Sequence, residues 1–254
     1  MSILLPIASA AACWWLFTIL ALYRTGLPER TYGSTFWLAS AIAMLGVAGL
    51  AYSVGNSSSV HAYLAFTSAL AIWSWHEITY FLGYVTGPRP QRCPPGLSQW
   101  QRFLHGVRAC LWHELAVIGT AGVIAWMSLG QPNKVGLATF CLLWLMRWST
   151  KLNIFLGVWN FHLEYLPPRL SYLASYMARR RMNPLFPLSV AAGLALVGYW
   201  CVQGLATGAS DFAVSSSLLL ATLTALALLE HIFLMMDVPD GKLWQLARTS
   251  HQSR

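Results

Sequence analysis

The segment Trp73–Pro90, WSWHEITYFLGYVTGPRP, decides the fold, because an apolar stretch carrying an adjacent histidine and glutamate ends in a turn rich in glycine and proline. Pro88 and Pro90 stop a helix from continuing. The apolar part has the character of the end of a membrane helix, where an ionisable pair is costly. The pattern recurs in Cys110–Gly119, CLWHELAVIG, and, with the two residues reversed, in Ala225–Met236, ALALLEHIFLMM.

The composition indicates an integral membrane protein. Of the 254 residues, 57% are hydrophobic and only 9% are charged, whereas a soluble domain carries about 25% charged residues. The mean hydropathy is +0.54. Because neither a long linker nor a low-complexity tract interrupts the chain, we predict a single polytopic transmembrane helical domain that covers residues 1–254.

Seven apolar runs are long enough to cross a bilayer, for which a helix needs about 20 residues. The runs are Ile3–Tyr23, Phe36–Val54, His61–Tyr84, Leu104–Ser128, Val135–Trp159, Leu185–Ala206 and Phe212–Met236. The predicted fold class is therefore an all-α integral membrane protein, a bundle of about seven transmembrane helices.

The basic residues predict the orientation, because lysine and arginine accumulate in cytoplasmic loops. Those in connecting segments on one predicted side are Arg24, Arg30, Arg89, Arg92, Arg102, Arg169, Arg179, Arg180, Arg181, Lys242, Arg248 and Arg254, against only Lys134 on the other. The N-terminus is therefore expected in the periplasm and the C-terminus in the cytoplasm. Since this rule explains the net charge of +8, we expect no nucleic-acid partner.

With this orientation, the three ionisable pairs lie at a similar depth in the cytoplasmic leaflet. We predict that they converge on one site; the residues are His76, Glu77, His113, Glu114, Glu230 and His231. Arg147 lies deep in its run and needs an acidic partner. Asn153 is a candidate to hydrogen-bond a ligand or a carboxylate. Lys151 is close enough to the cytoplasmic end for its side chain to reach water.

Three interpretations of the cluster remain open. All six residues could serve as ligands for iron or another divalent metal, as histidine and glutamate do in helical bundles. Alternatively, a tetrapyrrole such as bacteriochlorophyll could be bound by His76, His113 or His231 as axial ligand, with Arg147 and Asn153 nearby. In the third interpretation the cluster is an ion-pair network, in which Arg147 contacts a glutamate directly.

Several common catalytic motifs are absent from the sequence. It contains no G-x-x-x-x-G-K-[ST], no G-x-G-x-x-G after a strand, no G-x-S-x-G and no H-E-x-x-H. Nucleotide hydrolysis and serine or zinc-type proteolysis are therefore unsupported. A transporter is disfavoured, because no inverted repeat or broken-helix pair is evident. A membrane-bound, non-haem, metal-dependent oxidase or oxygenase acting on a pigment or lipid-like substrate stays possible, so the sequence leaves enzymatic activity undecided.

The central segment also carries a family resemblance. Its features are Trp75, His76, Glu77, Gly83, Gly87, Pro88, Arg89, Cys93, Pro94, Arg102, Phe103, His113 and Glu114. In this combination the chain resembles the PuhE family of photosynthetic complex assembly proteins from anoxygenic phototrophic bacteria. The resemblance implies a multi-pass protein of the bacterial inner (intracytoplasmic) membrane. It further implies a factor for assembly of the reaction centre and light-harvesting complex, or for bacteriochlorophyll supply, with lipid and the subunits of those complexes as partners.

Overall fold

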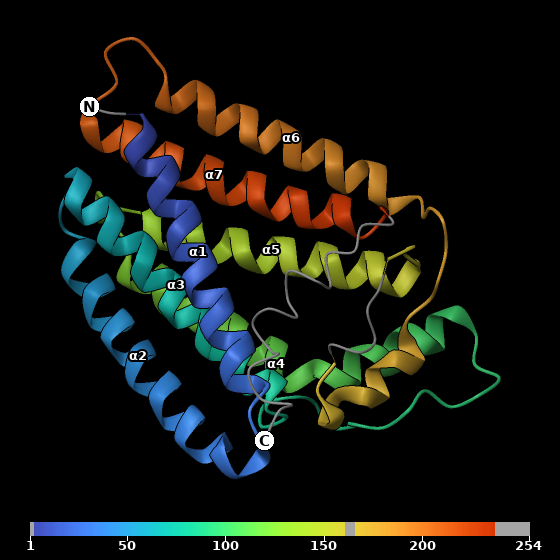
Figure 1. Ribbon diagram of the computed structural model, residues 1–254. Coiled ribbons are helices and arrows are strands. Elements are labelled where there is room, and N and C mark those ends of the chain that lie inside the picture. The colour runs from blue at the N-terminus through green and yellow to red at the C-terminus, as the bar shows by residue number, and fades with distance from the viewer. Residues whose placement is uncertain (1–2, 161–165, 237–254) are drawn as a thin grey trace, which may run out of the picture.

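The computed structural model describes residues 3–160 and 166–236, and within these ranges the chain is helical, with one isolated β-bridge between Val158 and Arg179. The elements are α1 (Leu4–Thr25), η1 (Glu29–Thr31), α2 (Tyr32–Ser53), α3 (Ser59–Phe81), α4 (Gln99–Met127), α5 (Val135–Leu156), η3 (Pro168–Tyr176), α6 (Leu185–Gly204) and α7 (Asp211–Phe233) (Figure 1). The C-terminus, with its three basic residues, lies outside the described ranges.

Each predicted apolar run forms a helix, although the boundaries shift by a few residues. The largest shift is at α4, which begins at Gln99 and not at Leu104. The cause is a capping box: Gln101 N donates to Ser98 Oγ at 3.3 Å, and Ser98 N donates to Gln101 Oε1 at 3.0 Å. These two bonds satisfy amide groups that otherwise lack partners at a helix start, and so extend α4 by a turn beyond the apolar run.

Five of the described helical segments are long and apolar enough to cross a membrane: α1, the continuous segment Glu29–Ser53, α4, α6 and α7. This supports the predicted class of a helical membrane protein. The other two long helices, α3 and α5, do not meet the same criterion. Ionisable residues within them, such as Glu77 and Arg147, lower their hydropathy.

Helix α3 occupies the centre of the arrangement. It packs against α1, α2, α4, α5 and α7, and in Figure 1 it runs beneath α1 and alongside α2. Phe66 of α3, Phe140 of α5 and Leu219 of α7 are fully buried in one core cluster. Helix α2 approaches α3 closely at Gly46, where a Cβ atom would come within 2.8 Å of the Ser68 carbonyl oxygen. Small residues at such crossings let helix backbones pack directly.

The connections that carry the basic residues are tied together at one end of the bundle. Arg169 donates to both carboxylate oxygens of Glu29, at 3.2 and 2.9 Å, and to the Leu82 carbonyl oxygen at 3.4 Å. The Tyr176 hydroxyl donates to the Gln91 carbonyl oxygen at 2.9 Å. Helix η3 therefore joins the α1–α2 connection to the α3–α4 connection.

At the other end, Asn133 joins the α2–α3 and α4–α5 connections. Its Nδ2 donates to the carbonyl oxygens of Ser53 at 3.0 Å and His61 at 3.1 Å, while its Oδ1 accepts from Val135 N at 3.1 Å. These contacts therefore place the α1–α2 and α3–α4 connections together at one end of the helices and the α2–α3 and α4–α5 connections together at the other.

Candidate functional site

The first buried charge pair joins α3 to α5. Arg147 Nη2 lies 2.7 Å from Glu77 Oε2, and the two side chains retain 30% and 13% of their accessible surface. The Arg147 guanidinium carbon also lies 5.8 Å from the centre of the Phe81 ring. A direct contact between Arg147 and a glutamate is what the ion-pair interpretation requires.

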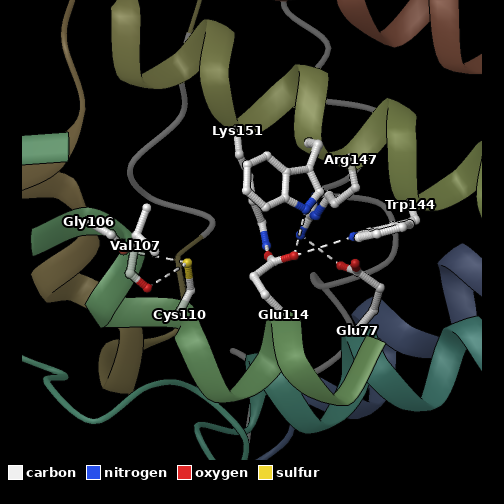
Figure 2. Close-up of polar contacts among 9 residues, drawn as sticks. Glu77, Gly106, Val107, Cys110, Glu114, Trp144, Arg147 and Lys151 are labelled. Carbon is white, nitrogen blue, oxygen red and sulfur yellow. Dashed lines mark hydrogen bonds and ion pairs between the residues drawn. The ribbon is translucent and has the colours of Figure 1, made fainter. Parts of the chain in front are cut away.

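The second pair joins α4 to α5. Lys151 Nζ lies 2.5 Å from Glu114 Oε1, and Trp148 Nε1 donates to Glu114 Oε2 at 2.7 Å, with Trp144 Nε1 3.5 Å from the same oxygen. Both Glu114 oxygens therefore accept hydrogen bonds, which offsets the cost of burying this carboxylate. Figure 2 shows Lys151, Arg147 and Trp144 extending from α5 toward Glu114 and Glu77 on the facing helices.

The two histidines that precede these glutamates lie between α3 and α4. The rings of His76 and His113 are each 1% exposed, and their centres are 6.3 Å apart at an interplanar angle of 85°. His76 Nε2 is hydrogen-bonded to Thr120 Oγ1 at 3.0 Å, and the Tyr80 ring lies 4.5 Å from that of His113. Among the described residues, the Nδ1 atom of each ring has no hydrogen-bond partner.

His231 belongs to a separate polar chain between α5, α6 and α7. Its Nδ1 donates to the Ala227 carbonyl oxygen at 2.8 Å, which leaves Nε2 to accept from the Ser149 hydroxyl at 2.9 Å. Asn153 Nδ2 donates to the Ser149 carbonyl oxygen at 2.9 Å and to Ser189 Oγ at 3.0 Å. This chain fixes the three helices relative to one another and is distinct from both glutamate pairs.

The six residues predicted to converge are therefore divided among separate partners. Consecutive residues point about 100° apart around a helix, so His76 contacts α4 while Glu77 contacts α5, and His113 packs on Tyr80 while Glu114 contacts α5. Glu230 is exposed. In the described part of the chain, no three His, Cys, Asp or Glu side chains lie close enough together to hold a metal ion.

Sequence reasoning missed the partners of Glu114. Lys151 was expected to reach toward water. It instead pairs with this buried carboxylate, because α4 packs against α5 where Lys151 lies. A signal was available in the spacing: Trp144, Trp148 and Lys151 follow at intervals of four and three residues, which places them on one face of α5. Thr120, Ser149 and Ser189 carry no such signal, since short hydroxyl residues are common in membrane helices.

The fold and these contacts define a helical membrane protein in which two largely buried glutamates are each paired with a cation from α5. The chain belongs to the family described as "Protein of unknown function (DUF3623)", whose model matches residues 1–254. It is 37% identical over 236 residues, 91% of this chain and 85% of the relative, to a Rhodobacter capsulatus protein described as "Uncharacterized 30.4 kDa protein in puhA 5'region". No solved structure matches the chain.

Proposed function

We propose that this protein is an inner-membrane factor for assembly of the photosynthetic reaction centre and light-harvesting complex or for its bacteriochlorophyll supply. The observation that carries the proposal is the relative described by its position in the puhA 5' region. That position agrees with the resemblance of the Trp75–Glu114 segment to the PuhE family. The relative and the family resemblance both support a role in photosynthetic complex formation.

We further propose that all seven long helices cross the membrane, with the basic connections in the cytoplasm. Helices α3 and α5 are less apolar than the other five, but they lie against several neighbours, and their charges are paired. Paired charges that face other helices cost far less than charges that face lipid. The connections that hold most of the basic residues lie together at one end of the bundle, which supports a common cytoplasmic side.

In this proposal the ionisable residues have a structural role. Arg147 and Lys151 attach α5 to α3 and α4, and the His231 chain attaches it to α6 and α7. Such pairing fixes which helix faces remain outward. Helix α4 presents Trp112 and Trp126, and α6 presents Leu188 and Val202, all more than half exposed. These faces are where helices of photosynthetic subunits would pack.

Isolation of the tagged protein from mildly solubilised membranes tests the proposal. We expect reaction-centre or light-harvesting subunits to co-purify during the period when complexes are formed, and to be absent from a preparation of an unrelated tagged membrane protein. A chain that brings down none of these subunits, even after cross-linking in intact membranes, would contradict an assembly role through direct helix contacts.

A further inference from the structure

A cavity of about 330 Å³ lies between α1, α3, α5 and α7. Much of its wall is apolar and aromatic: Trp14 and Phe17 come from α1, Trp73 from α3 and Leu143 from α5. Ligand pockets in proteins are commonly of this kind, mostly apolar with a few polar groups that fix orientation, and range from about 300 to 1,000 Å³. The cavity therefore suits one hydrocarbon chain.

The charged groups of the cavity lie toward one end. Glu77, Arg147 and Glu230 all line it, and Glu77 and Glu230 are each within one turn of the end of their helix. Those helix ends face the connections that carry the basic residues. Because Glu230 is exposed, this end of the cavity reaches the molecular surface. An amphiphile in the cavity would thus lie as a lipid of the cytoplasmic leaflet does, with its head at the surface and its chain inward.

The charge balance at this end selects the head group. Two carboxylates face one guanidinium, and the Arg147–Glu77 contact uses only one oxygen of Glu77. The other oxygen, Oε1, is buried without a hydrogen-bond partner in the described part of the chain. Arg147 Nε is likewise buried without a partner among the described residues, so this end offers one free donor beside the free acceptor, while two carboxylates against one guanidinium leave its net charge negative. A cation that donates hydrogen bonds complements the negative charge and the free Glu77 oxygen, whereas a head that carries only negative charge is repelled by the two carboxylates.

We propose that this cavity binds an amphiphile with an ammonium head, held by Glu77 and Glu230, and a hydrocarbon chain that lies among the aromatic residues. This inference goes beyond the assembly role and does not depend on it. Two sources share the required chemistry: a free long-chain amine, and a bilayer phospholipid with a primary amine head, one chain of which enters the cavity.

Binding of dodecylamine and of dodecanoic acid to the detergent-purified protein tests the head-group preference, because the two probes have chains of similar length and heads of opposite charge. We expect dodecylamine to bind at least about tenfold more tightly, because only its ammonium head can form charge-assisted hydrogen bonds with the carboxylates. In nanodiscs, displacement of dodecylamine by phosphatidylethanolamine identifies a bilayer lipid as the source, and no displacement identifies the free amine. Equal binding of the two probes would overturn the proposal.

Variants locate the binding. Glu230→Gln removes one carboxylate and leaves the Arg147–Glu77 pair intact, so the affinity for dodecylamine should fall about tenfold. Asp211→Asn, the same change at the opposite end of α7, is the matched control and should have no effect. Thr18→Phe fills the cavity from α1 and should weaken binding of any chain of this length. If Glu230→Gln and Thr18→Phe both bind dodecylamine as the unmodified protein does, the cavity is not the site.

Discussion

At the scale of single residues, the interior of this protein is organised by two cations on one helix. Arg147 and Lys151 are four residues apart on α5 and so share a face, yet each meets a different helix through a glutamate. Removing one partner of such a pair leaves an uncompensated buried charge, which is more damaging than removing both. The glutamates and the cations should therefore behave as coupled pairs in mutagenesis.

We predict that Lys151→Met destabilises the protein by roughly 2 kcal/mol, less than the full cost of breaking a buried pair, because Trp148 and Trp144 still donate to Glu114. The double variant Glu114→Gln with Lys151→Met should recover part of this loss, since neither charge is then left alone. Thermal unfolding in detergent measures both. A loss of stability in the double variant equal to the sum of the losses in Glu114→Gln and Lys151→Met alone would show that the pair is not coupled.

For the other pair, we predict that Arg147→Lys retains most of the stability and Arg147→Met does not. A lysine preserves the positive charge beside Glu77, whereas methionine leaves that carboxylate unpaired in a site that is only 13% exposed. Accumulation of the protein in membranes, compared between the two variants, is the readout. Equal accumulation would mean that the charge at position 147 does not matter for folding.

At the scale of elements, the connection after α3 forms a hydrogen bond with the backbone of α4. His113 N donates to the Thr86 carbonyl oxygen at 2.9 Å, and the Tyr172 hydroxyl lies 3.4 Å from the Ala109 carbonyl oxygen. In a regular helix these two α4 groups would bond each other. Burial raises the pKa of Tyr172 to about 12, so its hydroxyl stays protonated and able to donate near neutral pH.

Gly87 is the residue that permits this contact, because a Cβ atom there would collide with the α4 backbone at Arg108–Cys110. We predict that Gly87→Ala costs about 1–3 kcal/mol, as overpacking against a rigid neighbour does. Gly119→Ala on α4 is the matched control: nothing lies near its added methyl group, and alanine favours the helix by up to about 1 kcal/mol. Chemical unfolding should separate the two variants in opposite directions.

How far the sequence predicts the structure differs between the elements and the site. The apolar runs predict the helices well, because a helix that is buried in lipid or in the protein core needs a long apolar stretch in either place. The site depends on the rotation of each helix about its own axis, which hydropathy does not reveal. His76 and Glu77 are adjacent in sequence, yet one contacts Thr120 and the other Arg147. The similar depth of the ionisable residues in their helices predicted that some of them would be in contact, but it did not predict which residues form pairs.

At the scale of the whole molecule, the proposed topology predicts on which side of the membrane each exposed connection can be labelled. In a background without native cysteines, Asn56→Cys should react with a membrane-impermeant maleimide from the periplasmic side. Arg92→Cys should react only from the cytoplasmic side. Both positions are exposed, so accessibility within the protein does not distinguish them. The opposite labelling pattern would reverse the orientation, and labelling of both from one side would contradict the seven-span arrangement.

The central proposal is that the protein serves the formation of photosynthetic complexes, and the alternative is a membrane-bound enzyme that acts on a pigment or lipid-like substrate. The amounts of reaction-centre and light-harvesting complexes, relative to total extractable bacteriochlorophyll, in membranes of a strain lacking this protein test the claim most directly. We predict that the complexes are depleted, that no pigment precursor accumulates, and that the intact chain restores the complexes. Accumulation of a defined precursor in that strain would contradict the claim and indicate an enzyme.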